Sequence, residues 1–335
     1  MVRNNDQVSI YEKDYCAEGI EIYMKKAEYL TPVVTIFDRV GNIDQKGNEM
    51  VYDFLIKGGV DGIVVMGSTG EFFAMSMEQK KRLIDIAVPY IKGKVKCMIG
   101  TGCMSVRDTV ELSNYACDAG ADAVMIVCPY YFPLSAEDIE AYYDTVLPQV
   151  RGKVFIYNYP GATGDDVTPE ITLNLLRKHK NLVGYKDTIE LFSHTRKLIE
   201  VTKDEFPDFI VYSGYDENLV HIMLSGGNGC IGGLSNFAPK LCSEWCRAIN
   251  EKNWEYMFDC QEKVNGLMYI YSSKTPFPQV AKKALNLQGV PVSEYCMHFS
   301  KRPPTVKKLQ AFIDGIDLEN LMKRNNKQAI KKETK

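Results

Sequence analysis

The chain has 335 residues, a formal net charge of -3 and 45% hydrophobic residues. This composition indicates a globular protein with a large core, and the small charge gives no general attraction to nucleic acid or to an anionic membrane. No apolar run is long enough to span a bilayer. The first 28 residues are polar and charged and do not resemble a secretory leader, so we expect a cytoplasmic protein.

The cysteines and histidines give no sign of a metal centre. The ten cysteines are scattered without a CxxC pair, and the four histidines form no cluster with the spacing of metal ligands. Cys242 and Cys246 lie four residues apart, as on one face of a helix, and packing explains this spacing better than a metal does. We therefore expect reduced thiols and no metal site.

One pattern recurs eight times after residues 1–28, which we interpret as an N-terminal extension. Each time, a short apolar or β-branched run, a turn and an amphipathic stretch follow one another over roughly 20 to 33 residues, the length of a β/α unit. The predicted strands, in chain order, are residues 30–36, 62–66, 95–100, 123–127, 154–157, 182–185, 209–213 and 229–232.

The stretches between the strands carry helix start and stop signals. Ser76 and Gln79 match a capping box, and Thr168 precedes a proline at the first helical position. Gly120 can end a helix in the left-handed conformation and let the chain turn into the fourth strand. Eight such units with continuous apolar strands predict an α/β fold, a parallel sheet closed into a (β/α)8 TIM barrel. The alternative is an open doubly wound sheet with fewer strands or a second domain.

The pattern changes after the eighth strand. Residues 29–240 are predicted to form the barrel core. Residues 241–323 are predicted to form the last barrel helix and a C-terminal helical appendage, with proline interruptions at residues 275–278 and 302–304. Residues 324–335 are rich in lysine, and we expect them to form a disordered basic tail.

Reactive residues of a TIM barrel are sought at the carboxyl ends of its strands, where the active sites of such enzymes lie. After the second strand come Gly67, Ser68, Thr69, Gly70 and Glu71. The exposed backbone N–H groups and two hydroxyls of such a turn can form a nest that binds a carboxylate or a phosphate. A well-capped loop between strand and helix is the alternative.

Tyrosines follow the fourth strand and end the fifth. Tyr130 and Tyr131 lie between prolines at the barrel mouth, where simple packing at the rim is the alternative to a role in the site. Tyr157 ends the fifth strand, and a phenol at that place can relay a proton. A core tyrosine with a satisfied hydroxyl would give the same sequence.

Lys186, at the end of the sixth strand, is the strongest single signal in the chain. A lysine on an apolar barrel strand points inward, where lysine is rare unless it is paired or reactive. Desolvation disfavours its charged form, and a neutral amine is the nucleophile that forms a Schiff base with a ketone. A structural ion pair with Asp187 is the alternative.

Two further segments lie around the last two strands. Asp216 and Glu217 follow the seventh strand, where they could meet the far end of a substrate or cap the next helix. Residues 227–232 match a G-x-G-x-x-G spacing, but the dinucleotide fingerprint needs a preceding strand and a following helix. Nucleotide binding is disfavoured because these glycines enter and occupy a strand.

These motifs, in this order and at this spacing, resemble the dihydrodipicolinate synthase / N-acetylneuraminate lyase family of class I pyruvate aldolases. The resemblance covers roughly residues 30–239, and it rests on Gly67-Ser68-Thr69-Gly70-Glu71, Tyr157-Asn158-x-Pro160 and Gly184-x-Lys186-x-Thr188. It implies that Lys186 forms a Schiff base with a pyruvoyl carbonyl and that Tyr157 shuttles protons. It also implies that no metal or diffusible cofactor is required.

The resemblance extends to the surroundings of the lysine. The residues that it implies for substrate binding are Ser68, Thr69, Gly70, Thr188, Asp216, Glu217 and Ile231. Tyr131 matches the tyrosine that completes a hydroxyl relay with Thr69 and Tyr157. In this family that tyrosine reaches the site of the neighbouring subunit, so we expect a homotetramer built from dimers.

Departures from the family patterns distinguish among its members. Synthases carry an arginine two residues beyond the Tyr-Asn-x-Pro motif, where this chain has Ala162, so a second substrate carboxylate would lose its bidentate partner. Sialic acid lyases share the segment with Asp216 and Glu217, which would hold a polyhydroxylated tail. They usually carry a serine where this chain has Gly233.

The remaining motif phrases look most like those of 2-keto-3-deoxygluconate and related sugar-acid aldolases. These phrases are Pro129-Tyr130-Tyr131-x-Pro133, Tyr157-Asn158-Tyr159-Pro160-x-Ala162-Thr163-Gly164 and Lys186-Asp187-Thr188-Ile189-Glu190. We therefore predict an aldolase that cleaves a 2-keto-3-deoxy sugar acid reversibly to pyruvate and an aldehyde. The alternatives are N-acetylneuraminate lyase, then dihydrodipicolinate synthase, then a non-catalytic protein that binds pyruvate or a sugar acid.

Overall fold

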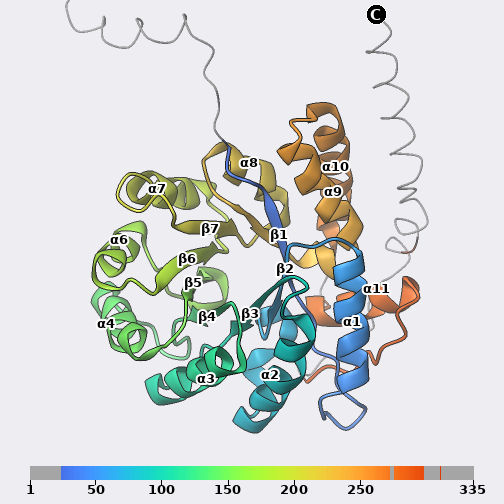
Figure 1. The fold of residues 1–335 in the computed structure, drawn as a ribbon, viewed down its shortest axis with the longest axis horizontal. Helices are drawn as coiled ribbons and strands as arrows, with labels where there is room; N and C mark the ends of the chain where they lie inside the picture. Colours follow the sequence, from blue (N-terminus) through green and yellow to red (C-terminus); the bar gives the residue numbers. More distant parts are fainter. Residues whose placement is uncertain (1–23, 272–274, 298–309, 311–335) are drawn as a thin grey trace, which may run out of the picture.

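The computed structural model describes residues 24–271, 275–297 and 310, and its strands close into a parallel barrel (Figure 1). Each strand pairs with the next in chain order, and the last pairs with the first. The strands are β1 Glu28–Pro32, β2 Gly62–Val65, β3 Lys96–Gly100, β4 Ala123–Val127, β5 Val154–Asn158, β6 Leu182–Asp187, β7 Ile210–Ser213 and β8 Gly229–Ile231. The predicted TIM barrel is confirmed, and the open doubly wound sheet was the wrong alternative.

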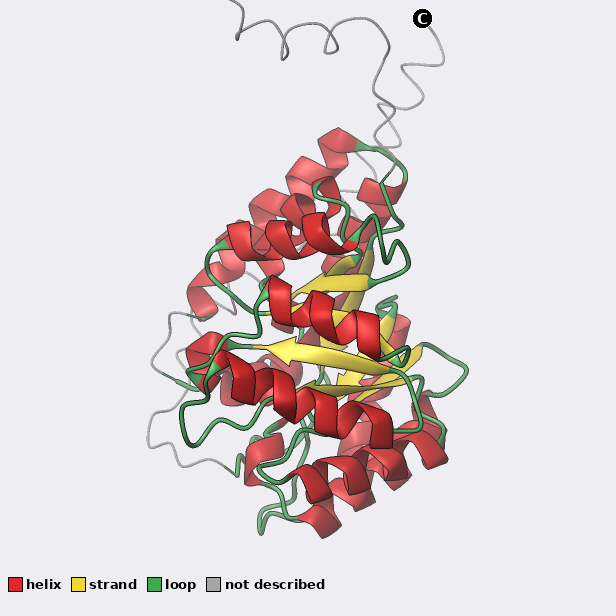
Figure 2. Cartoon of the chain, turned by 90° about the vertical axis from the view of Figure 1, so that its left-hand side faces the viewer, coloured by secondary structure: helices red, strands yellow, loops and turns green. Residues whose placement is uncertain are grey.

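Helices surround the strands on their outer side, as the side view in Figure 2 shows. Those that follow the successive strands are α1 Gln45–Lys57, α2 Met77–Ile91, α3 Val106–Ala119, α4 Ala136–Val146, α6 Pro169–Lys178, α7 Phe192–Thr202, α8 Leu219–Leu224 and α9 Pro239–Asn250. A short helix, α5 Pro160–Thr163, precedes α6. Two longer helices, α10 Trp254–Leu267 and α11 Phe277–Leu287, follow the barrel. Because the helices cover the sheet, nearly all strand residues are buried.

The predicted helix signals act as the sequence indicates. The hydroxyl of Ser76 accepts the N–H of Gln79 at 3.2 Å, and the Gln79 side chain accepts the N–H of Ser76 at 3.0 Å. This capping box starts α2. Gly120 ends α3 with a φ of 98°, in the left-handed region. The first strand begins and ends earlier than predicted, because β1 covers Glu28–Pro32 rather than residues 30–36.

The difference in the first strand has a physical cause. Val33, Val34 and Ile36 are buried, but they pack beyond the end of the ladder, above the barrel. Apolar sequence marks burial, and it cannot distinguish a ladder residue from a buried loop residue. The other predicted strand ends differ from the observed ends by one or two residues.

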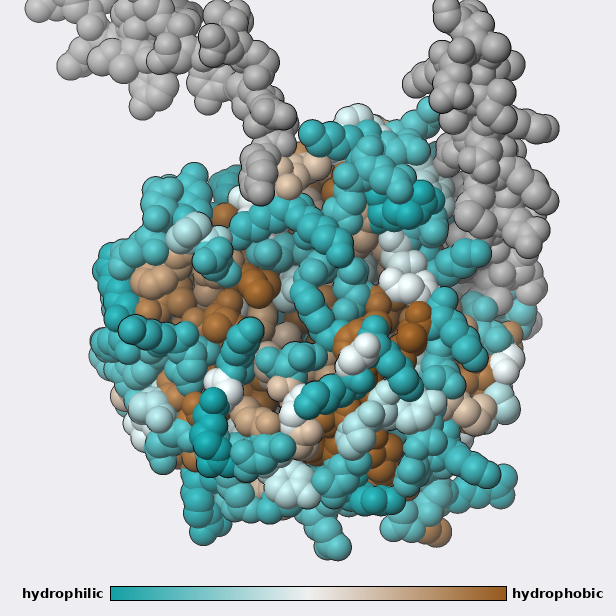
Figure 3. All heavy atoms as spheres, viewed as in Figure 1, coloured by the Kyte–Doolittle hydropathy of each residue, from teal (hydrophilic) through white to brown (hydrophobic). Residues whose placement is uncertain are grey.

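The C-terminal helices lie on one side of the barrel. The helix α10 packs against α9, and α11 contacts the 3-10 turn Ser68–Gly70 that follows β2. Figure 3 shows the molecule from the same direction as Figure 1, where hydrophilic residues cover most of the visible face and apolar residues gather toward its middle.

Some predictions concern residues outside the described ranges. These are most of the N-terminal extension, the prolines at residues 302–304 and the basic tail at 324–335. Within the described ranges, no helix combines the length and the apolar character that crossing a membrane requires.

Candidate active site

Lys186 and Tyr157 come together on neighbouring strands. They are paired residues in the ladder between β5 and β6, and both residues are buried, each with 4% of its surface exposed. The Nζ atom of Lys186 lies 4.3 Å from the centroid of the Tyr157 ring. The strand pairing therefore places the predicted nucleophile next to the predicted proton carrier.

Asp187 points away from Lys186, because consecutive residues of a strand face opposite sides of the sheet. Its buried carboxylate lies on the outer side of the barrel and accepts hydrogen bonds from Thr195 Oγ1 at 2.6 Å and from Asn158 Nδ2 at 3.1 Å. It also lies 2.8 Å from His194 Nδ1. These partners replace the Lys186–Asp187 ion pair that the sequence left open, and the structure shows no such pair within the ranges that it describes.

The loop after β2 brings Ser68 and Thr69 to the same place. The hydroxyl of Ser68 lies 3.3 Å from the hydroxyl of Tyr157. Ser68 and Thr69 occupy the first two positions of the 3-10 turn, where backbone N–H groups have no acceptor within the turn. Gly70 differs, because its N–H donates to the carbonyl of Gly67 at 2.9 Å. The N–H groups of the turn without a backbone acceptor therefore belong to Ser68 and Thr69, the two residues that also carry hydroxyls.

These residues open into one cavity of about 580 Å³. Its lining includes the predicted site residues Ser68, Thr69, Tyr157, Lys186, Thr188, Asp216, Glu217 and Ile231. Gly70 and Tyr131 are not among its lining residues. Thr188 is 7% exposed, and its hydroxyl is buried without a hydrogen-bond partner within the described part of the chain.

We name two parts of this cavity after the two substrate fragments that the sequence resemblance leads us to expect. The pyruvate half contains Ser68, Thr69, Tyr157, Lys186 and Ile231. The aldehyde half contains Tyr159, Glu190, Tyr215, Glu217, Tyr271 and Phe277. Apart from Glu217, the sequence did not single out the aldehyde half as a site. Pro276 and Pro278 were a usable signal, because they mark the start of α11, whose first turn lines the cavity.

Asp216 and Glu217 differ in how their carboxylates are used. Asp216 is buried and accepts hydrogen bonds from Tyr271 Oη at 2.6 Å, from the backbone N–H of Leu234 at 3.1 Å and from Tyr29 Oη. Burial raises the pKa of Asp216, although these donors oppose the rise. Burial also raises the pKa of Glu217, whose Oε2 has no hydrogen-bond partner among the described residues. Glu217 therefore has a buried oxygen without a donor among the described residues, whereas three donors fix the carboxylate of Asp216 in the cavity wall.

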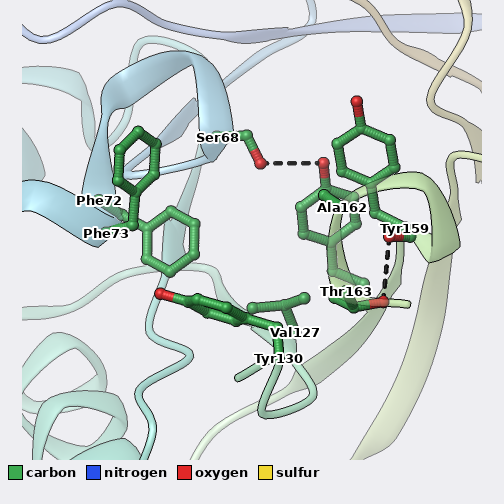
Figure 4. Close-up of a pocket in the computed structure, with 9 residues that line it drawn as sticks. Ser68, Phe72, Phe73, Val127, Tyr130, Tyr159, Ala162 and Thr163 are labelled. Atoms are coloured by element: carbon green, nitrogen blue, oxygen red, sulfur yellow. Dashed lines mark hydrogen bonds between the residues drawn. The ribbon is translucent and has the colours of Figure 1, made fainter. Parts of the chain in front are cut away.

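Tyr131 lies outside the cavity of its own chain. It is 79% exposed and packs edge-to-face on Phe132, with ring centroids 5.0 Å apart. A smaller apolar pocket of about 190 Å³ adjoins the cavity through Ser68, Tyr157 and Tyr159. Figure 4 shows this pocket, with Phe72, Phe73 and Tyr130 on one side and Tyr159, Ala162 and Thr163 on the other. One chain alone therefore does not bring Tyr131 to Lys186.

No group of three or more His, Cys, Asp or Glu side chains in the described ranges is arranged to hold a metal ion. The cavity instead presents an amine, phenols, hydroxyls and carboxylates. An amine held beside a phenol can act as a nucleophile toward a carbonyl substrate, with the phenol able to move protons.

The fold and the cavity thus define the class of protein, a TIM barrel with a lysine at the carboxyl end of its sixth strand. The profile of the Dihydrodipicolinate synthetase family matches residues 25–309, and the chain belongs to this family. It is accordingly a pyruvate-dependent lyase of the class I aldolase family.

Individual relatives agree with this assignment. The chain is 37% identical over 275 residues to the "Probable 2-dehydro-3-deoxy-D-pentonate aldolase YjhH" of Escherichia coli K12, covering 82% of this chain and 91% of that protein. It is 34% identical to a 4-hydroxy-tetrahydrodipicolinate synthase of Kosmotoga olearia, covering 73% of this chain and 85% of the other. The crystal structure of YagE from E. coli K12 in complex with pyruvate superposes with a TM-score of 0.81 at 33% identity, covering 88% of this chain and 98% of YagE.

Proposed function

We propose that this protein cleaves a 2-keto-3-deoxy sugar acid reversibly to pyruvate and an aldehyde, through an imine on Lys186. The observation that carries the proposal is the placement of Lys186 Nζ 4.3 Å from the Tyr157 ring, in a cavity that also holds Ser68 and Thr69. The relative YjhH is named for a 2-dehydro-3-deoxy-D-pentonate, and YagE was crystallised with pyruvate. Both facts support a substrate with a pyruvoyl group.

The proposed reaction uses the protonated imine as an electron sink. The Lys186 amine attacks C2 of the keto acid, and the resulting carbinolamine loses water to give a protonated imine. The C3–C4 bond then breaks, its electron pair moves toward the imine nitrogen to form an enamine, and the C4 hydroxyl gives up its proton as the aldehyde leaves. Protonation of the enamine at C3 and hydrolysis of the imine release pyruvate. None of these steps calls for a metal or a diffusible cofactor.

The residues around Lys186 have defined parts in this scheme. Tyr157 carries protons during the loss of water and at the C4 hydroxyl, because its ring lies beside Nζ and its hydroxyl lies 3.3 Å from Ser68 Oγ. Ser68 and Thr69 hold the carboxylate of the keto acid through their hydroxyls and the N–H groups of the 3-10 turn. Thr188 also lines the cavity, and its buried hydroxyl has no hydrogen-bond partner among the described residues.

The aldehyde half supports a neutral, hydroxylated aldehyde. Glu190 and Glu217 line it, and Lys186 is the single lysine or arginine among the described residues that line the cavity. Burial, together with the nearby Tyr159, Glu190 and Glu217, raises the pKa of Tyr215 to about 12, so that its hydroxyl stays a donor. Carboxylates and phenols of this kind accept and donate hydrogen bonds with sugar hydroxyls, and the carboxylates repel a phosphate or a second carboxylate. This charge and Ala162 both disfavour the synthase reaction.

Trapping with borohydride tests the proposal. Reduction in the presence of pyruvate should add one pyruvoyl group to the protein, located on Lys186 by peptide mass spectrometry. The Lys80→Ala variant is a matched control, because Lys80 is buried on α2 and does not line the cavity. An adduct that persists in Lys186→Ala would overturn the assignment.

The substrate needs a separate measurement. Values of kcat/KM for 2-keto-3-deoxygluconate, N-acetylneuraminate and the pyruvate and aspartate-semialdehyde pair should be highest for the first. A higher value for either of the others would assign that reaction instead. Stabilisation by these ligands without adduct or turnover would indicate a binding protein.

We also propose that the chain assembles as a homotetramer whose dimers exchange Tyr131. This side chain and Phe132 are strongly exposed, and an apolar pocket adjoins Ser68 and Tyr157 in each chain. Tyr131 of a second copy in that pocket would bring a phenol to the hydroxyl pair. Light scattering should give the mass of a tetramer, and Tyr131→Ala should lower kcat. A fully active monomer would refute this assembly.

A further inference from the structure

The loop after β2 is bounded by two residues in a conformation that glycine adopts most readily. Met66 and Glu71 both have a φ of 59°, and the 3-10 turn Ser68–Gly70 lies between them. Among the other described residues that are not glycine, Lys252 alone has a positive φ. Residues in this region persist where the surrounding structure holds them, and they concentrate at functional sites. The shape of this loop therefore depends on contacts outside it.

The side chain of Glu71 makes such contacts. It is fully buried, and its Oε1 lies 2.7 Å from Nζ of Lys282 on α11, which is fully buried as well. Its Oε2 accepts the backbone N–H of Met297 at 2.8 Å. Lys282 also donates to the carbonyl of Tyr295 at 2.7 Å and lies over the Phe37 ring, 5.0 Å from its centroid. One buried ion pair thus joins the loop after β2 to the C-terminal part of the chain and to the loop after β1.

The location of this pair separates it from the reacting groups. Neither Glu71 nor Lys282 lines the cavity, but Ser68 and Thr69 do, and so does the first turn of the helix that carries Lys282. A buried ion pair contributes little net stability, because the cost of desolvating both charges offsets most of their attraction. Its directional hydrogen bonds fix the relative position of the loop and the helix instead.

We propose that the Glu71–Lys282 ion pair positions the loop that holds the substrate carboxylate, so that α11 takes part in building the pyruvate half. This inference rests on the proposed function, in which Ser68 and Thr69 bind that carboxylate. Thr35 Oγ1 holds the same loop from the other side, since it donates to the carbonyl of Gly70 at 2.7 Å.

A displaced loop has a specific kinetic consequence. The hydroxyls of Ser68 and Thr69 move with the loop, whereas Lys186 and Tyr157 stay on β6 and β5. Loss of the ion pair should therefore weaken the binding of pyruvate more than it slows turnover of the bound keto acid. If the ion pair were purely structural, its loss would lower the stability of the fold without raising KM more than it lowers kcat.

Three variants and one control test the proposal. Glu71→Gln keeps the side-chain volume but removes the charge, and its single amide oxygen cannot replace both Oε1, which accepts from Lys282 Nζ, and Oε2, which accepts the N–H of Met297. The double variant Glu71→Leu/Lys282→Met removes both charges and so avoids an unpaired buried charge. The single Lys282→Met variant leaves that unpaired charge and shows how much stability its burial costs. The control is Lys283→Met, the next lysine of α11, which is partly exposed and pairs with Glu294 at 3.0 Å.

The readouts are KM and kcat for pyruvate in the aldol direction, with thermal unfolding to confirm folding. We expect KM to rise about threefold or more in Glu71→Gln and about tenfold or more in the double variant, with kcat changed by less than about threefold. Lys283→Met should match the wild type. A folded Glu71→Gln variant with wild-type KM overturns the proposal. A wild-type protein that forms no adduct with pyruvate overturns the proposed function instead, so the two failures are distinguishable.

Discussion

The two halves of the cavity are built from different parts of the barrel. The pyruvate half comes from the strands and from the first turn after β2, and the ladder itself sets Tyr157 opposite Lys186. The aldehyde half comes from the loops after β5, β6 and β7 and from the C-terminal helices. Ladder hydrogen bonds restrict Tyr157 and Lys186 in the first half, whereas packing of loops and of the first turn of α11 shapes the second.

This difference explains why the reaction is easier to assign than the substrate. A family can keep the strand ends that perform the chemistry and change the loops that meet the aldehyde. The relatives illustrate the point, since one is named a pentonate aldolase and another a 4-hydroxy-tetrahydrodipicolinate synthase. Variants of the pyruvate half should therefore abolish the reaction, whereas variants of the aldehyde half should redirect it.

The largest expected effect is the loss of the amine. Lys186→Ala should lower kcat for cleavage by about 10⁴-fold or more, because no other lysine lines the cavity within the described ranges. Steady-state assays that follow pyruvate release measure it, with Lys80→Ala as the control. Residual activity within tenfold of the wild type would mean that the pyruvate half does not act through this amine.

The next effect concerns the phenol beside the amine. Tyr157→Phe should lower kcat by about 10² to 10⁴-fold, since it removes the proton carrier and keeps the ring. Tyr159→Phe is a matched control, because its ring is stacked on that of Tyr157 but belongs to the aldehyde half. Pyruvate adduct formation and cleavage should both slow in Tyr157→Phe. Equal losses in the two variants would contradict the separation of the halves.

Most of the barrel could be predicted from sequence, because each strand is buried on both faces and appears as one apolar run between turns. The first strand shows the limit of that signal. Val33, Val34 and Ile36 form an apolar run that is buried above the barrel, and only the three-dimensional pairing shows that the ladder ends at Pro32. The closed order of strands followed from their number rather than from any local pattern.

The site likewise contains residues that could be predicted from the sequence and residues that could not. Lys186 and Tyr157 were identifiable because reactive side chains at strand ends are unusual in apolar surroundings. Glu190 was missed as a site residue because an exposed acid after a strand has the sequence of an ordinary solvated residue. The partner of Glu71 could not be foreseen either, since 211 residues separate it from Lys282 and only the folded chain brings them together. Tyr131 lies outside the cavity in a single chain.

A change of charge in the aldehyde half should redirect the enzyme rather than inactivate it. Glu217→Lys should raise the ratio of kcat/KM for phosphorylated glyceraldehyde over unphosphorylated glyceraldehyde by about tenfold or more, because it replaces a repelling carboxylate with a cation. Glu190→Lys should act in the same direction and less strongly, since Glu190 is exposed. Glu200→Lys, on the outer helix α7 and paired with Lys197, should leave the ratio unchanged. An unchanged ratio in Glu217→Lys would show that charge in the aldehyde half is not the basis of selectivity.

The smallest expected effect lies behind the pyruvate half, on the outer side of β6. Burial lowers the pKa of His194, but its hydrogen bond to Asp187 and the charges of Asp187, Asp166 and Glu170 outweigh burial, so the pKa is raised overall. A histidine with a raised pKa in the folded state stabilises the fold fully below its unfolded pKa, and this contribution is lost as pH rises through the folded pKa.

His194→Gln should therefore lower Tm by a few degrees at pH 6, corresponding to about 1 kcal/mol for a charged hydrogen bond, and by less at pH 9. His221→Gln, on α8, is the control. Asp187 directly follows Lys186, and it accepts a hydrogen bond from Asn158, which directly follows Tyr157. The same variant therefore tests whether contacts on the outer side of β6 affect the ladder that aligns Lys186 with Tyr157. A Tm difference that grows with pH would reverse the assigned sign. An unchanged kcat at pH 9 would show that the ladder alone holds Lys186 opposite Tyr157.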